Sequence, residues 1–221
     1  YWYNYAEELL IHERYHQAIE TLDRAIALNP RHYESWAKRG QALRNLGQYE
    51  DALNAYERAV HINPRFAWAW NGRGLTLREL GNPQEALISY ERAVQEDASV
   101  VWYYINQVNI LLDLDRQEDA LDVIEDTLSI EPDNATIWAR HGQVLRRLER
   151  YPDAIQSYER AITLHQSYAW AWNGKGLCHA ALNQWADALA CYQNAVEHDE
   201  TDVWFWHNAG EAYLNLGNND N

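Results

Sequence analysis

A period of 34 residues runs through the whole chain and constrains its fold more than any other feature. Large aromatic residues recur at this spacing, at Trp2, Trp36, Trp70, Tyr104, Trp138, Trp172 and Trp206. A small residue follows each after four positions, at Ala6, Gly40, Gly74, Gly142, Gly176 and Gly210, with Val108 as the exception. Three further columns keep the same register without insertion or deletion. Such a period predicts an array of stacked supersecondary units.

Each unit is expected to hold two amphipathic helices, which we name helix A and helix B. In the second unit they are predicted at about 33–46 and 49–62. The alanine and tyrosine columns of helix B stand at i, i+4 and i+7, which is one face of an α-helix. Gly47 suits the turn because glycine adopts positive φ at low cost, and Pro64 ends helix B. One pair cannot bury its apolar faces alone, so neighbouring pairs must stack.

The columns of the second unit resemble the tetratricopeptide repeat family, and the pattern recurs across essentially the whole chain. They are Trp36, Gly40, Ala52, Tyr56, Ala59 and Pro64. The resemblance implies an all-α, right-handed superhelical solenoid of antiparallel helix pairs, with the A helices lining a concave groove. We expect one array over 1–221, with units at about 1–32, 33–66, 67–100, 101–134, 135–168 and 169–202 and a final single helix at 203–217.

One unit departs from this pattern. In 101–134, Val108, Ile124 and Thr127 replace the usual Gly, Tyr and Ala. Larger residues at the glycine and alanine columns and a smaller residue at the tyrosine column change the fit between the two helices. The sequence therefore predicts looser or shifted packing in this unit.

The bulk composition narrows the class of partner. The 221 residues carry a formal net charge of −15, with a pI near 4.9. A strongly acidic chain is repelled by nucleic-acid phosphates and by anionic membrane surfaces, so we expect neither as a partner. Cys178 and Cys191 are too few for a disulfide scaffold and indicate buried thiols of a cytoplasmic protein. No apolar run reaches the roughly 18 residues that a membrane helix needs.

The start of the chain suggests a segment cut from a longer protein. It opens with Tyr1-Trp2-Tyr3, and the sequence contains no methionine. Its gapless, tryptophan-rich units look similar to arrays in large bacterial, especially cyanobacterial, proteins, where such arrays are joined to ATPase, kinase or protease domains. This likeness is an analogy at the level of fold.

One short motif suggests metal chemistry. Residues His12 to His16 spell H-E-x-x-H, which binds zinc only on one continuous helix. The repeat register aligns this segment with Leu46 to Glu50, across the turn between helices A and B, so we expect no metal site. No nucleophile–base pair, carboxylate dyad or phosphate-binding loop stands out either. We therefore expect a protein that is not an enzyme and has no cofactor.

Charge is distributed unevenly between the two kinds of helix. Over the seven expected A helices, nine basic and six acidic residues give +3, whereas the remainder of the chain carries −18. If helix A lines the groove, a relatively basic concave face would attract acidic or carboxylate-bearing peptides. The polar residues expected there are Lys38, Gln41, Arg44, Arg78, Arg140, Gln143 and Arg146.

Aromatic and amide residues complete the predicted surface. Trp68, Trp102, Trp170 and Trp204 stand two residues before the packing aromatic, where the resemblance implies that a side chain faces the groove. They could equally seal the joint to the preceding helix B. Asn106 and Asn208 occupy a position where many groove-binding relatives carry an asparagine, and an amide both donates and accepts hydrogen bonds. Asn71 and Asn173 come one position earlier and have the same capacity, or they are simply solvated.

Groove residues also repeat every 102 residues, or three units. Lys38, Gln41 and Arg44 return as Arg140, Gln143 and Arg146, and Trp102 with Asn106 returns as Trp204 with Asn208. Residues 66–75 and 168–177 share eight of ten positions. One interpretation is a duplicated three-unit block that presents one ligand-reading surface twice. The other is duplication history without meaning for binding.

Three functions remain open from the sequence. The leading one is a protein–protein interaction module that binds a peptide or partner protein along the A helices. A second is a self-associating scaffold, since open ends of an array expose apolar surface. A third is a regulatory or sensor segment of a larger signalling ATPase, kinase or protease.

Overall fold

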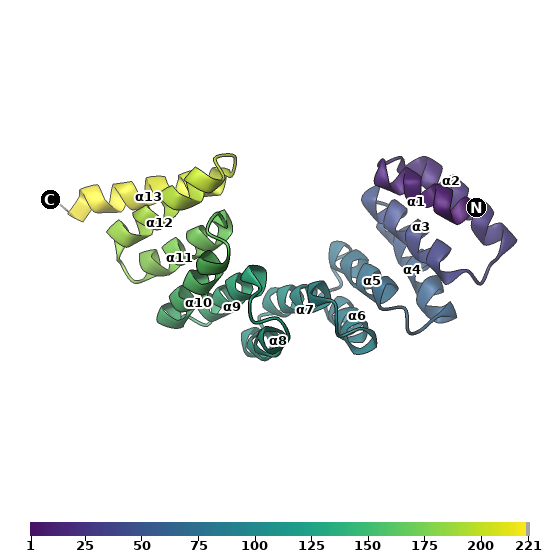
Figure 1. Cartoon of the computed structure of the whole chain (residues 1–221), viewed down its shortest axis with the longest axis horizontal. Coiled ribbons are helices and arrows are strands. Elements are labelled where there is room, and N and C mark those ends of the chain that lie inside the picture. Colours follow the sequence, from purple (N-terminus) through teal and green to yellow (C-terminus); the bar gives the residue numbers. More distant parts are fainter. Residues whose placement is uncertain (220–221) are drawn as a thin grey trace. The chain divides into compact units, whose positions relative to one another are not determined.

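The computed structural model describes residues 1–219, with side chains described to residue 217, and every regular element in this range is an α-helix. Thirteen helices lie within these residues (Figure 1). Their bounds are α1 Trp2–Ile11, α2 Tyr15–Leu28, α3 Tyr33–Asn45, α4 Tyr49–Ile62, α5 Ala67–Glu79, α6 Pro83–Glu96, α7 Val101–Asp113, α8 Gln117–Ile130, α9 Ala135–Arg147, α10 Tyr151–Leu164, α11 Ala169–Ala181, α12 Trp185–His198 and α13 Val203–Asn219. Consecutive helices form antiparallel pairs, as the sequence predicts.

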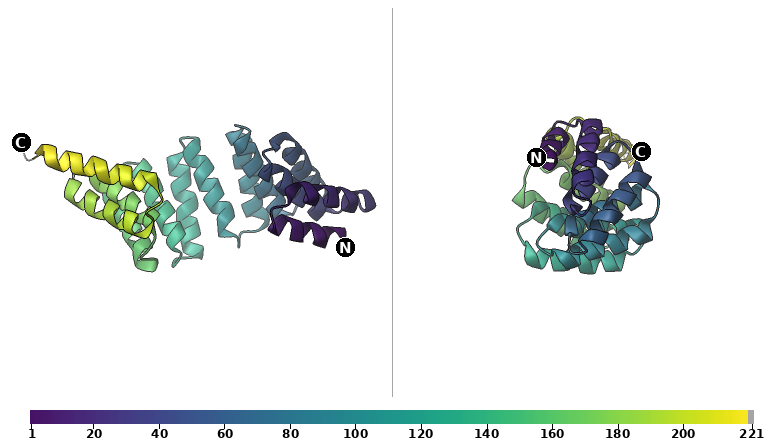
Figure 2. Two further views of the ribbon diagram at one scale, coloured as in Figure 1. Left: turned by 90° about the horizontal axis from the view of Figure 1, so that it is seen from above. Right: turned by 90° about the vertical axis from the view of Figure 1, so that its right-hand side faces the viewer.

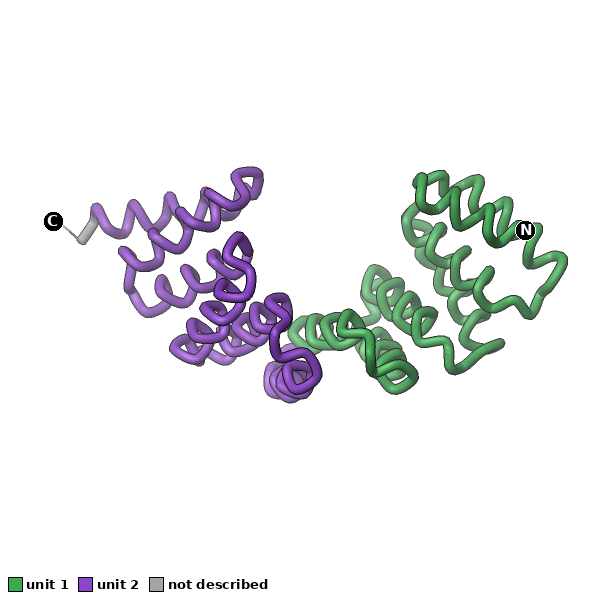
Figure 3. The backbone as a smooth tube through the Cα atoms, in the orientation of Figure 1, with its two compact units in different colours: residues 1–114 green, residues 115–221 purple. Residues whose placement is uncertain are grey.

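The chain forms two compact units, unit 1 at 1–114 and unit 2 at 115–221 (Figure 3). Unit 1 contains α1 to α7, and unit 2 contains α8 to α13. The expectation of one continuous array over the whole chain remains a prediction. Within unit 1, each even-numbered helix packs between the two odd-numbered helices that flank it in sequence, and the same holds for α10 and α12 in unit 2 (Figure 2).

The odd-numbered helices, which correspond to helix A, also touch one another directly. Contacts join α1 to α3, α3 to α5 and α5 to α7 in unit 1, and α9 to α11 in unit 2. In each unit, side chains of successive A helices can therefore meet on one face. The residues predicted to bind a ligand lie on these helices.

The turn inside each repeat follows the sequence prediction closely. Helix α4 has the predicted bounds, and α3 ends one residue early, at Asn45. Gly47 has φ of 74°, and Gln48 N–H donates to the Leu43 carbonyl at 2.9 Å, which closes the helix in a Schellman arrangement. Other repeats place a non-glycine residue at this left-handed position, namely Glu13, Asp115, Glu149 and Asn183. The final helix is longer than predicted because it continues to Asn219.

The tyrosine column of helix B explains two kinds of glycine. Tyr56 is buried, and a Cβ placed on Gly40 of the same repeat would lie 2.9 Å from its ring. A Cβ on Gly72, in the next A helix, would lie only 2.3 Å from Tyr56 Cε1. Tyr158 has the same arrangement with Gly142 and Gly174. The sequence pattern indicated the first glycine of each pair but missed the second.

The first and fourth repeats depart from the column pattern, and a matched exchange of volume preserves the packing of the first. In the first repeat, Ala6 replaces the glycine and Leu22 replaces the tyrosine, and both are fully buried. In the fourth repeat, Val108, Ile124 and Thr127 are also fully buried. Helix α7 belongs to unit 1 and α8 to unit 2, so the looser or shifted packing predicted for this repeat stays a prediction.

The aromatic column of helix A forms hydrogen bonds to the backbone of the preceding loop, a role that the sequence did not reveal. The indole N–H of Trp138 donates to the carbonyl of Pro132, six residues earlier, at 2.7 Å. Trp36, Trp70, Trp172 and Trp206 do the same at 2.8 to 3.0 Å. The Tyr104 hydroxyl reaches the equivalent carbonyl, that of Ala98, at 3.3 Å. From Trp36 onward, each column aromatic therefore satisfies a backbone acceptor at the joint between repeats.

Candidate binding surface on the odd-numbered helices

The predicted site residues fall into two sets, one on each compact unit. The unit 1 surface consists of Lys38, Gln41, Arg44, Trp68, Asn71, Trp102 and Asn106, on α3, α5 and α7. The unit 2 surface consists of Arg140, Gln143, Arg146, Trp170, Asn173, Trp204 and Asn208, on α9, α11 and α13. Each residue of one set lies 102 positions from its counterpart.

Each surface contains a cation stacked on a tryptophan of the next A helix. Lys38 Nζ lies 5.0 Å from the ring centre of Trp68, and Arg140 Cζ lies 4.7 Å from that of Trp170. Both distances are within the range of a cation–π interaction. Each indole is half-buried and also meets a helix B tyrosine edge-on, Tyr56 or Tyr158. Trp68 and Trp170 therefore pack against helix B and contact the predicted basic residue at once.

Each surface also contains a pair of asparagines that bridges two A helices. Asn106 Nδ2 donates to Asn71 Oδ1 at 2.7 Å, and Asn208 Nδ2 donates to Asn173 Oδ1 at 2.7 Å. All four are half-buried. An amide has two acceptor lone pairs and two donor hydrogens, so each pair keeps further hydrogen-bonding capacity.

The other two predicted tryptophans are among the most exposed large side chains of the chain. Trp102 is 63% exposed and Trp204 is 70% exposed. Large apolar side chains at this exposure, next to polar groups, are typical of interaction surfaces. Trp68 and Trp170 are less accessible, so the four tryptophans divide into a packed pair and an open pair.

The arginines Arg44 and Arg146 face buried tyrosine hydroxyls. Burial raises the pKa of Tyr56 to about 12, and the positive charge of nearby Arg44 opposes that rise. Burial raises the pKa of Tyr158 as well, with Arg146 opposing it. The Nε atoms of Arg44 and Arg146 are buried and have no hydrogen-bond partner within the described residues, and the same holds for Gln41 Oε1. In unit 2, Gln143 Oε1 instead accepts from Arg140 Nη1 at 2.8 Å.

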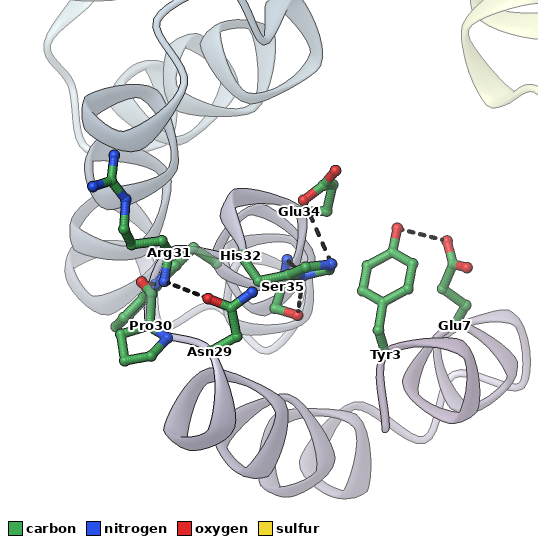
Figure 4. Close-up of polar contacts among 9 residues, drawn as sticks. Tyr3, Glu7, Asn29, Pro30, Arg31, His32, Glu34 and Ser35 are labelled. Carbon is green, nitrogen blue, oxygen red and sulfur yellow. Dashed lines mark hydrogen bonds and ion pairs between the residues drawn. The ribbon is translucent and has the colours of Figure 1, made fainter. Parts of the chain in front are cut away.

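Carboxylates of the chain already pair with two of the predicted basic residues in unit 1. Lys38 Nζ lies 3.4 Å from Glu7 Oε1, and Tyr3 donates its hydroxyl to the same oxygen at 3.1 Å (Figure 4). Arg78 pairs with Asp113 at 3.1 Å on the exposed surface of α5 and α7. Arg78 lies on an odd-numbered helix, as predicted, and its guanidinium forms an ion pair with an acidic neighbour.

A second column of basic residues on the A helices serves packing between repeats. Arg39, Arg73 and Lys175 pair with acidic residues on the preceding helix B, at Asp23, Glu57 and Glu159, over distances of 2.7 to 3.1 Å. Each acid stands 16 residues before its partner. Three of the nine basic residues in the A helices are thus held by helix B, and they contribute less to the predicted positive face than the sequence count implies.

His141 occupies this same column in unit 2. Its Nε2 lies 3.8 Å from Glu125, again 16 residues earlier, and its Nδ1 lies 3.0 Å from Ser157 Oγ. Burial lowers the pKa of His141, and Glu125 opposes the shift. A titratable group therefore stands where other repeats place a permanent cation.

Four family models, all described as tetratricopeptide repeat, match the chain. They cover residues 38–100, 133–201, 1–32, and the two segments 21–54 and 191–221. The chain is a tetratricopeptide repeat protein. Residues 101–132 lie outside these matches, and they form most of the repeat that departs from the column pattern. No curated protein matches this tetratricopeptide repeat protein significantly.

Solved structures support the same fold. The structure of YrrB, described as a TPR protein with an unusual peptide-binding site, is 17% identical, with a TM-score of 0.66, and the match covers 86% of this chain and 97% of that one. TTC0263 from Thermus thermophilus, described as a thermophilic TPR protein, is 23% identical, with a TM-score of 0.67, over 82% of this chain and 99% of its own. A chain of the Cut9–Hcn1 complex of APC/C is 15% identical, with a TM-score of 0.73, over 96% of this chain but only 42% of that one. At these identities the likeness concerns the fold alone.

The segment that spells a zinc motif lies across a helix boundary in this tetratricopeptide repeat protein, as predicted. Helix α1 ends at Ile11, and α2 begins at Tyr15, so His12 and His16 are not on one helix. Within residues 1–219, no group of three His, Cys, Asp or Glu residues is arranged to hold a metal ion. In the same range, no helix is both long and apolar enough to cross a membrane. The matched family models identify no catalytic domain.

Proposed function

We propose that the two surfaces on the odd-numbered helices bind a peptide or an extended segment of a partner protein. Tetratricopeptide repeat proteins generally mediate protein–protein interaction. The specific proposal is that the exposed tryptophans anchor apolar side chains, the asparagine pairs bond to the backbone of the ligand, and the arginines attract its acidic groups. The description of the similar YrrB structure as having a peptide-binding site agrees with this proposal.

The observation that carries the proposal is the repetition of one set of contacts in both units. A cation over a half-buried tryptophan, a bonded asparagine pair and an open tryptophan occur together on three successive A helices in each unit. Packing of helix A on helix B does not require an exposed indole. Trp102 and Trp204 therefore fit a role in contact with another molecule.

The test is a peptide array of systematically varied composition, followed by calorimetric titration of the best binders. We expect Trp102→Ala together with Trp204→Ala to weaken binding at least about tenfold, which corresponds to ~1.4 kcal/mol. The matched control removes exposed apolar side chains from even-numbered helices, Ile88→Ala with Ile130→Ala, and should leave affinity unchanged. Equal losses in both double variants, or binders indifferent to both, would contradict the proposal.

Self-association remains a second candidate because of one observation on α13. Val203, Trp206, Tyr213 and Leu214 are all more than half exposed there. A Cβ placed on Gly210 would meet nothing within 4 Å, whereas the glycines at the same column in α3, α5, α9 and α11 each face a tyrosine. Light scattering distinguishes the candidates, because a monomer at high concentration removes this one. The hypothesis of a regulatory segment in a signalling enzyme concerns other domains and stays a hypothesis.

A further inference from the structure

The two surfaces share their aromatic and amide groups but differ in charge. The odd-numbered helices of unit 1 carry five basic and five acidic residues, so their net charge is zero. Those of unit 2 carry four basic residues and one acidic residue, for a net charge of +3. The whole positive excess of the A helices therefore belongs to unit 2. Counterparts 102 residues apart are for this reason not electrostatically equivalent.

In unit 1, carboxylates of α1 lie beside the basic end of the surface. Glu7 pairs with Lys38. The Tyr3 hydroxyl donates a hydrogen bond to Glu7 as well (Figure 4). A shallow pocket beside Lys38 and Gln41 is lined by both Glu7 and Glu8. A carboxylate brought to Lys38 would displace Glu7 and would meet the negative charge of Glu8. Like-charge contact of this kind is a common way to exclude a ligand.

Unit 2 has no counterpart of α1, because its first odd-numbered helix is α9. The residues 102 positions after Glu7 and Glu8 are Asn109 and Ile110, which carry no charge and lie on α7 of unit 1. The single acidic residue on α9, α11 and α13 within the described residues is Glu211, which lies near Tyr192 of α12 and helps to raise the pKa of that tyrosine.

The two arginines of α9 are arranged to meet an anion on one face. Arg140 and Arg146 are six residues apart, with Gln143 between them on the same side of the helix. Arg140 stacks on Trp170 and donates to Gln143, which holds its guanidinium in place. Arg146 Nε is buried, and none of the described side chains bonds to it. Guanidinium groups bind carboxylates with two parallel hydrogen bonds, so this pair suits acidic side chains better than lysines would.

We infer that acidic peptide segments bind the unit 2 surface and that Glu7 and Glu8 exclude them from the unit 1 surface. The inference rests on the proposed function and assigns a ligand class to one of its two surfaces. The unit 1 surface then accepts segments that are neutral at this position, through Trp102 and the Asn71–Asn106 pair. A protein with one acid-selective and one acid-excluding surface distinguishes acidic from neutral segments of its partner.

The test uses a synthetic peptide that alternates Glu and Ala, with a Gln–Ala peptide as its uncharged match, titrated calorimetrically into the whole chain. We expect one Glu–Ala peptide to bind per chain, more weakly as ionic strength rises. Arg140→Glu with Arg146→Glu should reduce its affinity at least about tenfold, whereas Lys38→Glu with Arg44→Glu should change it less than about twofold. If the first variant is misfolded by circular dichroism, Arg140→Gln with Arg146→Gln replaces it, with the same expected direction.

The decisive variant adds a binding site. Glu7→Gln with Glu8→Gln should raise the stoichiometry for the Glu–Ala peptide from one to two, because it removes the carboxylates beside Lys38. A stoichiometry that stays at one overturns the exclusion by Glu7 and Glu8. Greater loss from the Lys38 and Arg44 variant than from the Arg140 and Arg146 variant overturns the assignment to unit 2, as does absence of Glu–Ala binding. These outcomes are separate from the tryptophan test above, which judges the proposed function with peptides of any charge.

Discussion

The ring of Tyr56 is enclosed between two glycines, which makes Gly72→Ala a sharp test of how the repeats pack. Tyr56 is 1% exposed. The new Cβ would lie 2.3 Å from Tyr56 Cε1 and 2.4 Å from Cζ, more than an ångström inside ordinary contact. The ring cannot retreat, because a Cβ at Gly40, on its other side, would already lie 2.9 Å from it. The substitution therefore forces α4 and α5 apart.

The expected magnitude is the difference of two effects. Replacing glycine by alanine inside a helix stabilises it by up to about 1 kcal/mol. Overfilling a packed core costs about 1–3 kcal/mol, and the short distances at Gly72 favour the upper part of that range. The net loss in free energy of unfolding is about 2 kcal/mol, which lowers the Tm of a chain of this size by roughly 4–8 °C.

Thermal unfolding followed by circular dichroism measures this loss, and Tm values are compared because repeat arrays unfold in steps. Gly210→Ala is the matched control, since a Cβ there meets nothing within 4 Å, and it should raise the Tm. In a Tyr56→Leu background, which lacks the outer part of the ring, Gly72→Ala should cost nothing. A Gly72→Ala variant as stable as the parent, or equally destabilised in both backgrounds, would refute the reasoning.

Three further predictions follow from single residues. Glu149 has φ of 58°, so Glu149→Gly should stabilise the chain by about 1 kcal/mol, and Asn183→Gly should stabilise it less because asparagine tolerates this conformation; urea unfolding measures both. Trp138→Phe removes the hydrogen bond to the Pro132 carbonyl and should cost about 1 kcal/mol in the same assay. Burial lowers the pKa of His141 from its ordinary 6.5. As the pH falls, this imidazole is therefore protonated in the unfolded chain before it is protonated in the folded chain. Stability should fall as pH drops through that value, and His141→Gln should flatten this part of the profile.

Much of the fold follows from the sequence because its columns report local packing needs. The 34-residue register placed the turn at Gly47 and both bounds of α4 correctly. It did not reveal why Gly72 is a glycine, since that residue contacts a tyrosine of the preceding repeat and no column runs through its position. The looser packing that it predicts around Val108, which is fully buried, stays a prediction, because α7 and α8 belong to different units.

The candidate site could be predicted as a set of residues but not as a set of contacts. The residue positions on A helices followed from the period, and the pairing of Asn71 with Asn106 required coordinates. Counting charges in the sequence gave the sign of the net charge on the A helices, but it did not show which helix faces carry that charge. Arg73 points to Glu57 on helix B, whereas Arg78 on the same helix pairs with Asp113 on the next A helix. Two basic residues a few positions apart on one helix lie on different faces and contact different neighbours, and a net charge count cannot show this.

Comparison of the two halves separates the role of the ion pairs from that of the aromatic groups. After 102 residues the tryptophans and asparagines return unchanged, whereas Arg78 and its partner Asp113 return together as Ala180 and Asn215. Loss of only one member would leave an uncompensated charge on the surface, and loss of both leaves none. Arg78 and Asp113 thus change as a pair, whereas Lys38 returns as the cation Arg140 and its partner Glu7 returns as the neutral Asn109. The charges of a surface therefore change while its aromatic and amide contacts stay fixed. Such independence is what allows two copies of one structure to select ligands of different charge.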